Sequence, residues 1–159
     1  MAGFERRVIE LGLVLPPPWK DQPNRVRALR SGRTIIMSGH GPLDADSVPI
    51  IKGKLGRELT AEQGAEAARL AALACLGTLR GQIGSLDRVA RLVRALGFIN
   101  CTSDFDQLPA VMNGFSDLMV QVFGEAGRST RSCIGVQQLY AGMPFEVEAQ
   151  FEVLAPDVK

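Results

Sequence analysis

The segment Phe145–Leu154 constrains the fold most, because its apolar and polar residues alternate strictly. Two glutamates flank Val147, and a further glutamate and a glutamine continue the polar positions toward the end of the segment. The apolar residues that share one side are Phe145, Val147, Ala149, Phe151 and Val153. A period of two is the period of a β-strand. The segment therefore predicts a strand with one face in a core and one polar face.

Other stretches of the chain also predict strands. Arg25–Ser38 predicts a hairpin with its turn at Ser31-Gly32, and Val89–Ile99 and Arg131–Gln138 predict single strands. Asp44–Lys54 predicts a loop that leads to a short edge strand. The predicted sheet thus receives strands from both ends and from the middle of the chain.

Two long helices are predicted between these strands. Thr60 and Gln63 fit a capping box, and alanines at helical spacing follow until Gly81 and Gly84, which we expect to end the helix. Pro109 suits the first turn of a second helix, in which apolar residues recur at spacings of three and four. The alanines allow the first helix to lie close against a sheet.

The order of elements, β-β-(β)-α-β-α-β-β, predicts an α+β fold of two layers, a mixed sheet with two helices on one face. The length of 159 residues predicts a single domain over residues 1–159. Within it, residues 1–24 are expected to form a short helix, Phe4–Leu11, and a strap through Pro16-Pro17-Pro18 that covers the main body.

Composition and charge exclude several classes of function. Lys and Arg exceed Asp and Glu by one, which argues against a nucleic-acid partner. The single histidine, His40, rules out a metal site of two or three histidines and a ribonuclease mechanism that pairs two histidines within one chain. The three cysteines include no C-x-x-C pair, so we expect neither a zinc site nor a disulfide framework.

We expect the protein to be cytoplasmic. The longest run without a charged residue, Ser132–Phe145, holds glutamines, glycines and a proline, and is too polar for a transmembrane helix. Charges at Glu5, Arg6 and Arg7 interrupt any signal peptide. The cysteine pattern adds to this expectation, because it fits a reducing compartment.

Two motifs near the C-terminus resemble the signature of the YjgF/RidA superfamily, also described as reactive-intermediate deaminases or "endoribonuclease L-PSP". The first is Thr130–Val136, which reads T-R-S-C-I-G-V, and the second is F-E-V-E-A at Phe145–Ala149. Ile35–Gly39 is similar to the family's strand that ends in Ser-Gly, and Asp104-Phe105 and Asn113 fit the region around its second helix. The resemblance extends from about Arg25 to Val153. Within the superfamily, the chain resembles a less-characterised YjgF-like subgroup.

The resemblance implies a fold like that of the small trimeric chorismate mutases, with clefts between the subunits of a homotrimer. It also implies hydrolysis of 2-imino and 2-enamino acids to 2-keto acids and ammonia, without a cofactor. Two other functions stay open. One is the non-catalytic binding of a small carboxylate. The other, which one family description suggests, is an RNA-directed endoribonuclease activity.

The last two strands allow a geometric expectation about the site. If a turn between Ala141 and Gly142 joins them, Arg131 faces Glu152, and Glu146 lies on the same polar face as Arg131 but six residues along it. At ~3.3 Å per residue the offset is on the order of 20 Å. One small molecule could then contact both residues only if a bulge intervenes or if the second residue comes from a neighbouring subunit.

The residue types suggest roles in imine hydrolysis, and each role has a structural alternative. The Arg131 guanidinium suits a substrate carboxylate, and Glu146 suits holding or deprotonating water. The alternatives are a cross-strand pair of Arg131 with Glu152 and a solvated position for Glu146. Cys133 and Asn113 are candidate substrate contacts, although Cys133 is most simply a small hydrophobe and Asn113 a solvated helix residue.

The remaining candidates lie in the first third of the chain. Ser38 and Gly39 are candidate substrate-binding residues from the Ser-Gly motif, and His40 after them is best read as structural. The basic cluster Arg25–Arg33 is read as a solvated hairpin face rather than an RNA site. The family's deaminases carry a tyrosine near the N-terminus. The sole tyrosine here is Tyr140, and Trp19 is a candidate to cover that region.

Overall fold

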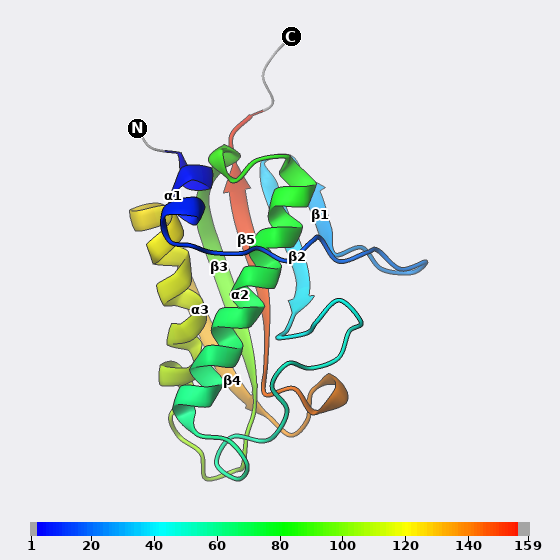
Figure 1. Ribbon diagram of the computed structural model, residues 1–159, viewed down its shortest axis with the longest axis vertical. Coiled ribbons are helices and arrows are strands. Elements are labelled where there is room, and N and C mark those ends of the chain that lie inside the picture. The colour runs from blue at the N-terminus through cyan, green and yellow to red at the C-terminus, as the bar shows by residue number, and fades with distance from the viewer. Residues whose placement is uncertain (1–2, 156–159) are drawn as a thin grey trace.

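The computed structural model describes residues 3–155, which form one mixed five-stranded sheet with helices on one of its faces (Figure 1). The strands are β1 (Ala28–Ser31), β2 (Thr34–His40), β3 (Val89–Asn100), β4 (Thr130–Val136) and β5 (Phe145–Val153). The helices are α1 (Phe4–Glu10), α2 (Ala61–Ile83) and α3 (Leu108–Phe123), with short 3-10 turns at Leu86–Arg88, Gly124–Gly127 and Tyr140–Gly142. The predicted two-layer α+β fold is confirmed.

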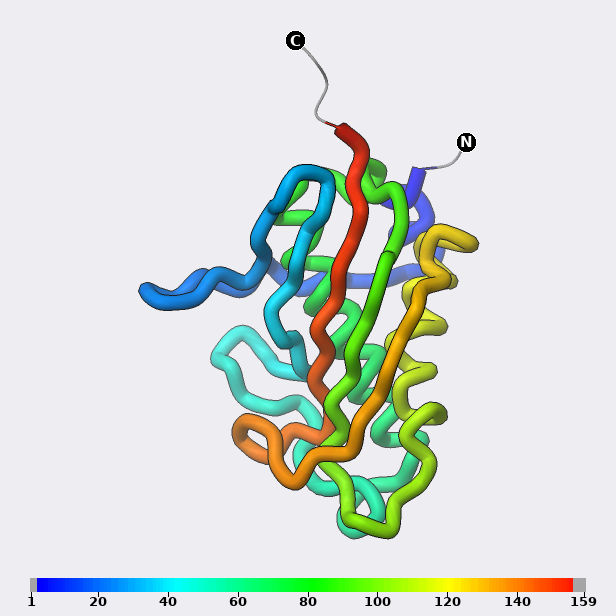
Figure 2. Tube along the Cα trace, turned by 180° about the vertical axis from the view of Figure 1, so that it is seen from behind, coloured from blue at the N-terminus to red at the C-terminus, as the bar shows by residue number. Residues whose placement is uncertain are grey.

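The strand order across the sheet is β1-β2-β5-β3-β4. β3 and β4 run parallel and are joined through α3, whereas the other neighbouring pairs are antiparallel. The last strand of the chain therefore lies in the middle of the sheet, and β4 lies at its edge. Seen from behind, no helix covers the second face of the sheet (Figure 2).

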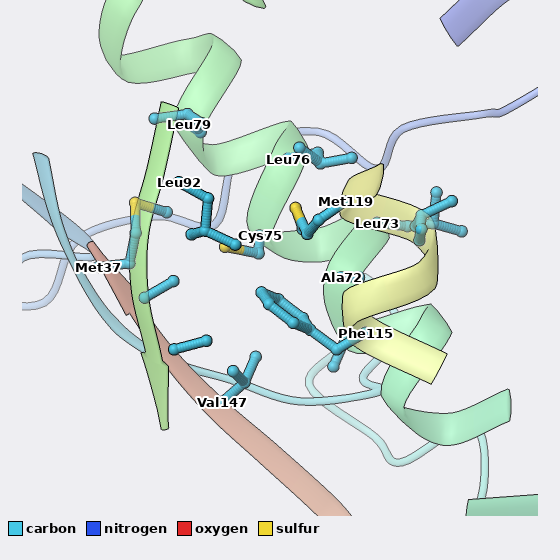
Figure 3. Close-up of a cluster of buried hydrophobic side chains, with 14 of the residues drawn as sticks. Met37, Ala72, Leu73, Cys75, Leu76, Leu79, Leu92, Phe115, Met119 and Val147 are labelled. Carbon is cyan, nitrogen blue, oxygen red and sulfur yellow. The ribbon is translucent and has the colours of Figure 1, made fainter. Parts of the chain in front are cut away.

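The core lies between this sheet and the two long helices. Leu76, Phe115 and Met119 of the helices meet Leu92 and Val147 of the sheet, and all five are buried (Figure 3). The strict alternation of β5 is confirmed, because its odd-numbered residues are buried while Glu148 is exposed. None of the described helices combines the length and the apolar character that a membrane span needs.

The capping box that opens α2 is present. The Thr60 side chain accepts from the backbone N–H of Gln63, and the Gln63 side chain accepts from the backbone N–H of Thr60. The prediction that Gly81 ends the helix is wrong, since α2 continues to Ile83 and Gly84 caps it with a φ of 84°. Gly81 is instead small because the ring of Pro18 lies against it.

The strap after α1 crosses α2. The carbonyl oxygen of Pro16 lies where a Cβ of Gly77 would stand, so this helix turn needs glycine for the strap to pass. Leu15 beside it is buried. The strap therefore packs on the body as expected, and its approach depends on two glycines one helical turn apart, Gly77 and Gly81.

Two predicted features are corrected. The edge strand expected within Asp44–Lys54 does not form, because the Asp44 carboxylate accepts from the backbone N–H groups of Asp46 and Val48 and closes a loop there. The hairpin of the last two strands is also wrong. β4 pairs with β3, and β5 fits between β2 and β3, where its buried face meets the core.

The chain between β4 and β5 therefore has to pass the end of β3. Lys54 holds this crossing, since its ammonium donates to Asn100 Oδ1 and to the backbone carbonyls of Cys101 and Gln137. The backbone N–H of Asn100 donates to the Pro144 carbonyl and its side-chain amide to the Met143 carbonyl. These bonds take the place of the predicted hairpin turn.

Gly77→Ala tests the strap. Intrinsic propensity favours alanine over glycine within a helix by about 0.5–1 kcal/mol, but the new Cβ would meet the Pro16 carbonyl. We expect the contact to prevail, so that the free energy of unfolding in urea falls by about 1–3 kcal/mol. Exposed Gln82→Ala on the same helix is the control and should change it by less than about 0.5 kcal/mol. A gain in stability in Gly77→Ala would contradict the packing described here.

Candidate functional site

Five of the six predicted site residues, all except Ser38, fall into two groups on different parts of the chain. The first, the β4-edge cluster, consists of Arg131 and Cys133 on β4 with Asn113 and Ser116 on α3. The second is a cavity of about 350 Å³ that Glu146 and Gly39 line, named here the Glu146 cavity. The full lining of this cavity is Trp19, Gln22, Arg25, Arg27, Gly39, Gly41, Leu43, Ser47, Tyr140, Met143 and Glu146.

Sheet register places Arg131 on the face that the helices cover. Arg131 stands opposite Ala95, which stands opposite Ala149, and both alanines are buried on that face. Because β4 is the edge strand, the Arg131 side chain stays exposed and reaches over α3. Its NH1 group donates to Ser116 Oγ at 2.8 Å and its NH2 group to Asn113 Oδ1 at 2.8 Å.

Two neutral acceptors on α3 thus orient a guanidinium that has further N–H donors to offer. Asn113, expected either to contact a ligand or to be solvated, is exposed and holds Arg131. Cys133 lies on the same side of the sheet as Arg131 and is half-buried against the core. The cluster can therefore present a positive, planar group to a carboxylate that approaches the open edge of the sheet.

The expected geometry of Arg131 and Glu146 is wrong in its details. Glu152 does not face Arg131 but forms an ion pair with Arg33 at 3.0 Å. Glu146 stands opposite Phe98, three residues beyond the partner of Arg131 on β3, and its side chain points to the uncovered face. The two residues are therefore on opposite faces of the sheet, with Cα atoms about 14 Å apart by sheet geometry.

Glu146 owes its setting to an irregularity in β2. The register of β2 against β5 shifts between Met37 and His40, so that Gly39 lies directly against the Glu146 carboxylate. A Cβ on residue 39 would occupy the position of Glu146 Oε1. The Ser-Gly motif thus provides the room for a half-buried carboxylate, and glycine is required there.

Ser38 was predicted to bind substrate, but its hydrogen bonds are structural. Its hydroxyl donates to the Val26 carbonyl at 2.7 Å, and its backbone N–H donates to the Arg27 carbonyl. Ser38 does not line the cavity but fastens to β2 the segment that carries Arg25 and Arg27. Its contribution to the site is therefore the placement of those arginines.

The electrostatics of the cavity favour a protonatable carboxylate. Burial raises the pKa of Glu146, and the neighbouring charge of Glu148 raises it further, while Arg25 and Arg27 act in the opposite direction. A carboxylate with a raised pKa can both accept and release a proton closer to neutral pH. Within residues 3–155, no three His, Cys, Asp or Glu side chains gather closely enough to hold a metal ion.

His40 is structural, as expected. It is fully buried, with Nδ1 at 2.7 Å from the Ser38 carbonyl and Nε2 at 2.9 Å from Thr78 Oγ1. Its ring stacks on Trp19 at 4.8 Å between centroids, so Trp19 covers it from the strap. Burial lowers the pKa of His40 to about 4, and the charges of Arg27 and Arg25 contribute to the shift.

Three residues of the cavity, Arg25, Arg27 and Tyr140, were not recognised as site residues from the sequence. Arg25 and Arg27 were read as part of a solvated hairpin face. Arg25 is exposed, as expected, and Arg27 is half-buried, but both also line the cavity, whereas Arg30 does not. The two-residue spacing of Arg25 and Arg27 in an extended segment, which puts both on one side, was the available signal. Trp19 and Tyr140 also line the cavity, although they come from the strap and from the turn before β5.

His40→Gln tests the structural role of the histidine through pH. The unfolded chain binds a proton near pH 6.5 that folded His40 binds only near 4, so its contribution to stability is present above pH 6.5 and is lost as the pH falls toward 4. Glutamine cannot titrate. We expect the wild type to be more stable than the variant at pH 7.5, and urea unfolding to show that this advantage shrinks by roughly 2–3 kcal/mol at pH 4.5. An advantage that is independent of pH would show that His40 is not buried in the neutral form.

Comparisons with known proteins agree with the fold and with the resemblance to the YjgF family. The family model described as "YjgF/chorismate mutase-like, putative endoribonuclease" matches residues 5–144. The protein TCP17 of Trypanosoma cruzi is 38% identical over 144 residues, which cover 90% of this chain and 89% of that protein.

Among solved structures, a "putative endoribonuclease" from Shewanella oneidensis is 28% identical, with a TM-score of 0.89 over 95% of this chain and 99% of that one. Escherichia coli TdcF, solved with bound serine, shares the fold at 21% identity, with a TM-score of 0.57 over 87% of this chain and 94% of its own. With a family match over most of its length and a relative of this similarity, the chain belongs to the YjgF/chorismate mutase-like family.

Proposed function

We propose that the protein hydrolyses reactive 2-imino and 2-enamino acids to 2-keto acids and ammonia. The observation that carries the proposal is the pair of half-sites, an oriented guanidinium at the β4 edge and a half-buried carboxylate of raised pKa in a cavity. An imino acid needs one cation for its carboxylate and one base for the attacking water. Arg131 and Glu146 are the cation and the base proposed for these roles, and they belong to different half-sites.

The proposed active site therefore lies between subunits, with Arg131 from one and Glu146 from the next. The uncovered sheet face supports such an assembly, because the strand register places Leu29, Ile36 and Ile134 on it, where they are exposed, together with half-buried Leu96 and Phe98. Apolar side chains gathered on one face favour contact with another protein surface. We propose a homotrimer that buries this face and brings the β4 edge of one subunit to the Glu146 cavity of its neighbour.

In this arrangement Arg131 binds the substrate carboxylate through parallel N–H donors, and Asn113 and Ser116 hold it in place. Glu146 holds a water molecule over the imine carbon and takes a proton as the C–O bond forms. The C=N π electrons move to nitrogen, and Glu146 passes its proton to that nitrogen, which gives a carbinolamine. The hydroxyl of the carbinolamine then loses its proton to nitrogen by way of Glu146, the C–N bond breaks, and ammonia leaves as the C=O bond of the keto acid forms. Because such imines also hydrolyse in water, orientation alone contributes a useful acceleration.

The relatives support a small substrate of this kind, since TdcF, a protein of the same fold, holds serine. The free thiols support a reducing compartment, and we propose the cytoplasm: Cys75, Cys101 and Cys133 form no disulfide. An endoribonuclease reaction is less well supported, because both ring nitrogens of the sole histidine are engaged in the interior.

A non-catalytic carboxylate binder is the second candidate. The family's N-terminal tyrosine has no counterpart in the sequence of this strap, which favours binding without turnover. Tyr140 and Trp19 nevertheless supply aromatic side chains to the Glu146 cavity from other segments. An activity measurement separates the two candidates directly.

An imine-hydrolysis assay tests the proposal. An amino-acid oxidase generates 2-imino acids in the presence of semicarbazide, and the readout is how far the protein suppresses the trapped product. We expect wild-type protein to suppress it, and Arg131→Ala to lose at least about tenfold of this activity because the carboxylate loses its charged hydrogen bonds. Arg6→Ala is the matched control and should keep the activity, because Arg6 is exposed on α1, pairs only with Glu10 among the described residues and lines neither the β4 edge nor the Glu146 cavity.

The solution mass completes this test. We expect wild type and Arg131→Ala to have a mass near three times 17.1 kDa, with unchanged unfolding transitions. If wild-type protein suppresses no product across small and branched substrates, the deaminase proposal fails and the binding function remains. If the protein is a monomer at micromolar concentration, the shared site is wrong.

A further inference from the structure

The Glu146 cavity contains two arginines that the proposed imine hydrolysis does not use. Arg25 and Arg27 line it together with Trp19. They sit on an arm, residues 20–27, that projects from the body beside β1 and borders the cavity together with the loop after β2 and the turn before β5 (Figure 2). A mutual hydrogen-bond pair between the backbones of Gln22 and Arg25 closes the tip of the arm.

The arm is held in place from several sides. The backbone N–H of Arg27 donates to Asp21 Oδ1 at 2.7 Å, and its guanidinium lies over the Trp19 ring at 4.8 Å. Trp19 is in turn stacked on His40, and the Ser38 hydroxyl is bonded to the Val26 carbonyl. The Arg27 side chain is therefore placed by packing before any ligand arrives.

The two guanidiniums are not neutralised by a partner. In residues 3–155, neither Arg25 nor Arg27 has a carboxylate within ion-pair distance, and the charged side chain that shares the cavity with them is Glu146. Burial and the nearby charge of Arg25 lower the pKa of Arg27, while Asp21 and Glu146 act in the opposite direction. Two like charges that line one cavity favour an anion between them.

We propose that Arg25 and Arg27 bind a second anionic group of the substrate, so that the preferred substrates are imino acids with an acidic side chain. The inference rests on the proposed function: Arg131 of a neighbouring subunit binds the α-carboxylate, Glu146 serves the imine carbon, and the arm takes the distal carboxylate. The hydrolysis itself is unchanged, with water as the co-reactant and ammonia as the leaving group. The arm adds specificity.

A pair of ligands that differ in one carboxylate tests the inference. The probes are 2-oxoglutarate and 2-oxopentanoate, stable keto acids with the same number of carbons, and the measurement is calorimetric titration of the full-length protein. We expect 2-oxoglutarate to bind at least about tenfold more tightly, and its affinity to fall about tenfold in Arg25→Gln. The affinity for 2-oxopentanoate should stay the same in this variant.

Control variants distinguish specificity from general charge. Arg30→Gln removes an exposed arginine of β1 that does not line the cavity, and should change neither affinity. Raising the salt concentration should lower the affinity for 2-oxoglutarate more than the affinity for 2-oxopentanoate. Arg27→Lys keeps the charge while changing the stack on Trp19, and should retain part of the preference for the dicarboxylate.

Other outcomes would overturn the inference and leave the proposed function measurable. Equal affinity of wild-type protein for both ligands, or no binding of either while imine hydrolysis persists, removes the second anion site alone. If Arg25→Gln lost affinity equally for both ligands, the arm would bind the α-carboxylate, which contradicts the assignment made here. Absence of imine hydrolysis together with tight 2-oxoglutarate binding would refute the reaction and keep the dicarboxylate site.

Discussion

The insertion of β5 between β2 and β3 is the constraint on which the rest of the structure depends. It places the most regular amphipathic strand at the centre of the sheet, where Phe145, Val147 and Phe151 are fully buried. It also forces the chain to cross the end of β3, and Lys54 and Asn100 bind that crossing through backbone carbonyls. With β5 in the centre, β4 is left at an open edge.

This topology separates the two groups that the proposed chemistry needs. Arg131 follows β4 to the edge and bonds to α3, whereas Glu146 opens onto the other face beside Gly39. A single chain therefore carries two complementary halves and cannot close them on one small molecule. The uncovered sheet face, with exposed Ile36 and Ile134, provides the surface through which copies of the chain can meet.

Much of the fold could be predicted from the sequence, because local patterns determine it. The capping box at Thr60, the alternation of β5 and the Pro109 helix start each depend on residues close together in the chain. Strand pairing could not be predicted in the same way. An alternating strand can pair with any neighbour in a sheet, so the alternation of β5 was equally compatible with a hairpin and with the observed strand order.

The site was predictable in part for the same reason. Motif resemblance selected Arg131 and Glu146, and Asn113 with them, but it gave neither their faces nor the bond between Asn113 and Arg131. Arg25 and Tyr140 come to the Glu146 cavity from distant segments through tertiary packing. The sequence signal for them was weak, since a cluster of arginines on a hairpin is most often solvated.

The most direct test of a site shared between subunits is complementation of two impaired variants. Arg131→Ala and Glu146→Gln are each expected to lose at least about tenfold of the imine-hydrolysis activity, because each lacks one half of every site. If the halves come from different subunits, unfolding and refolding an equal mixture should restore roughly a quarter of the wild-type activity. In such a mixture each half of a site is intact with a chance of about one half, so about a quarter of the sites contain both intact halves. No activity above that of the separate variants, in a mixture shown to exchange subunits, would contradict the shared site.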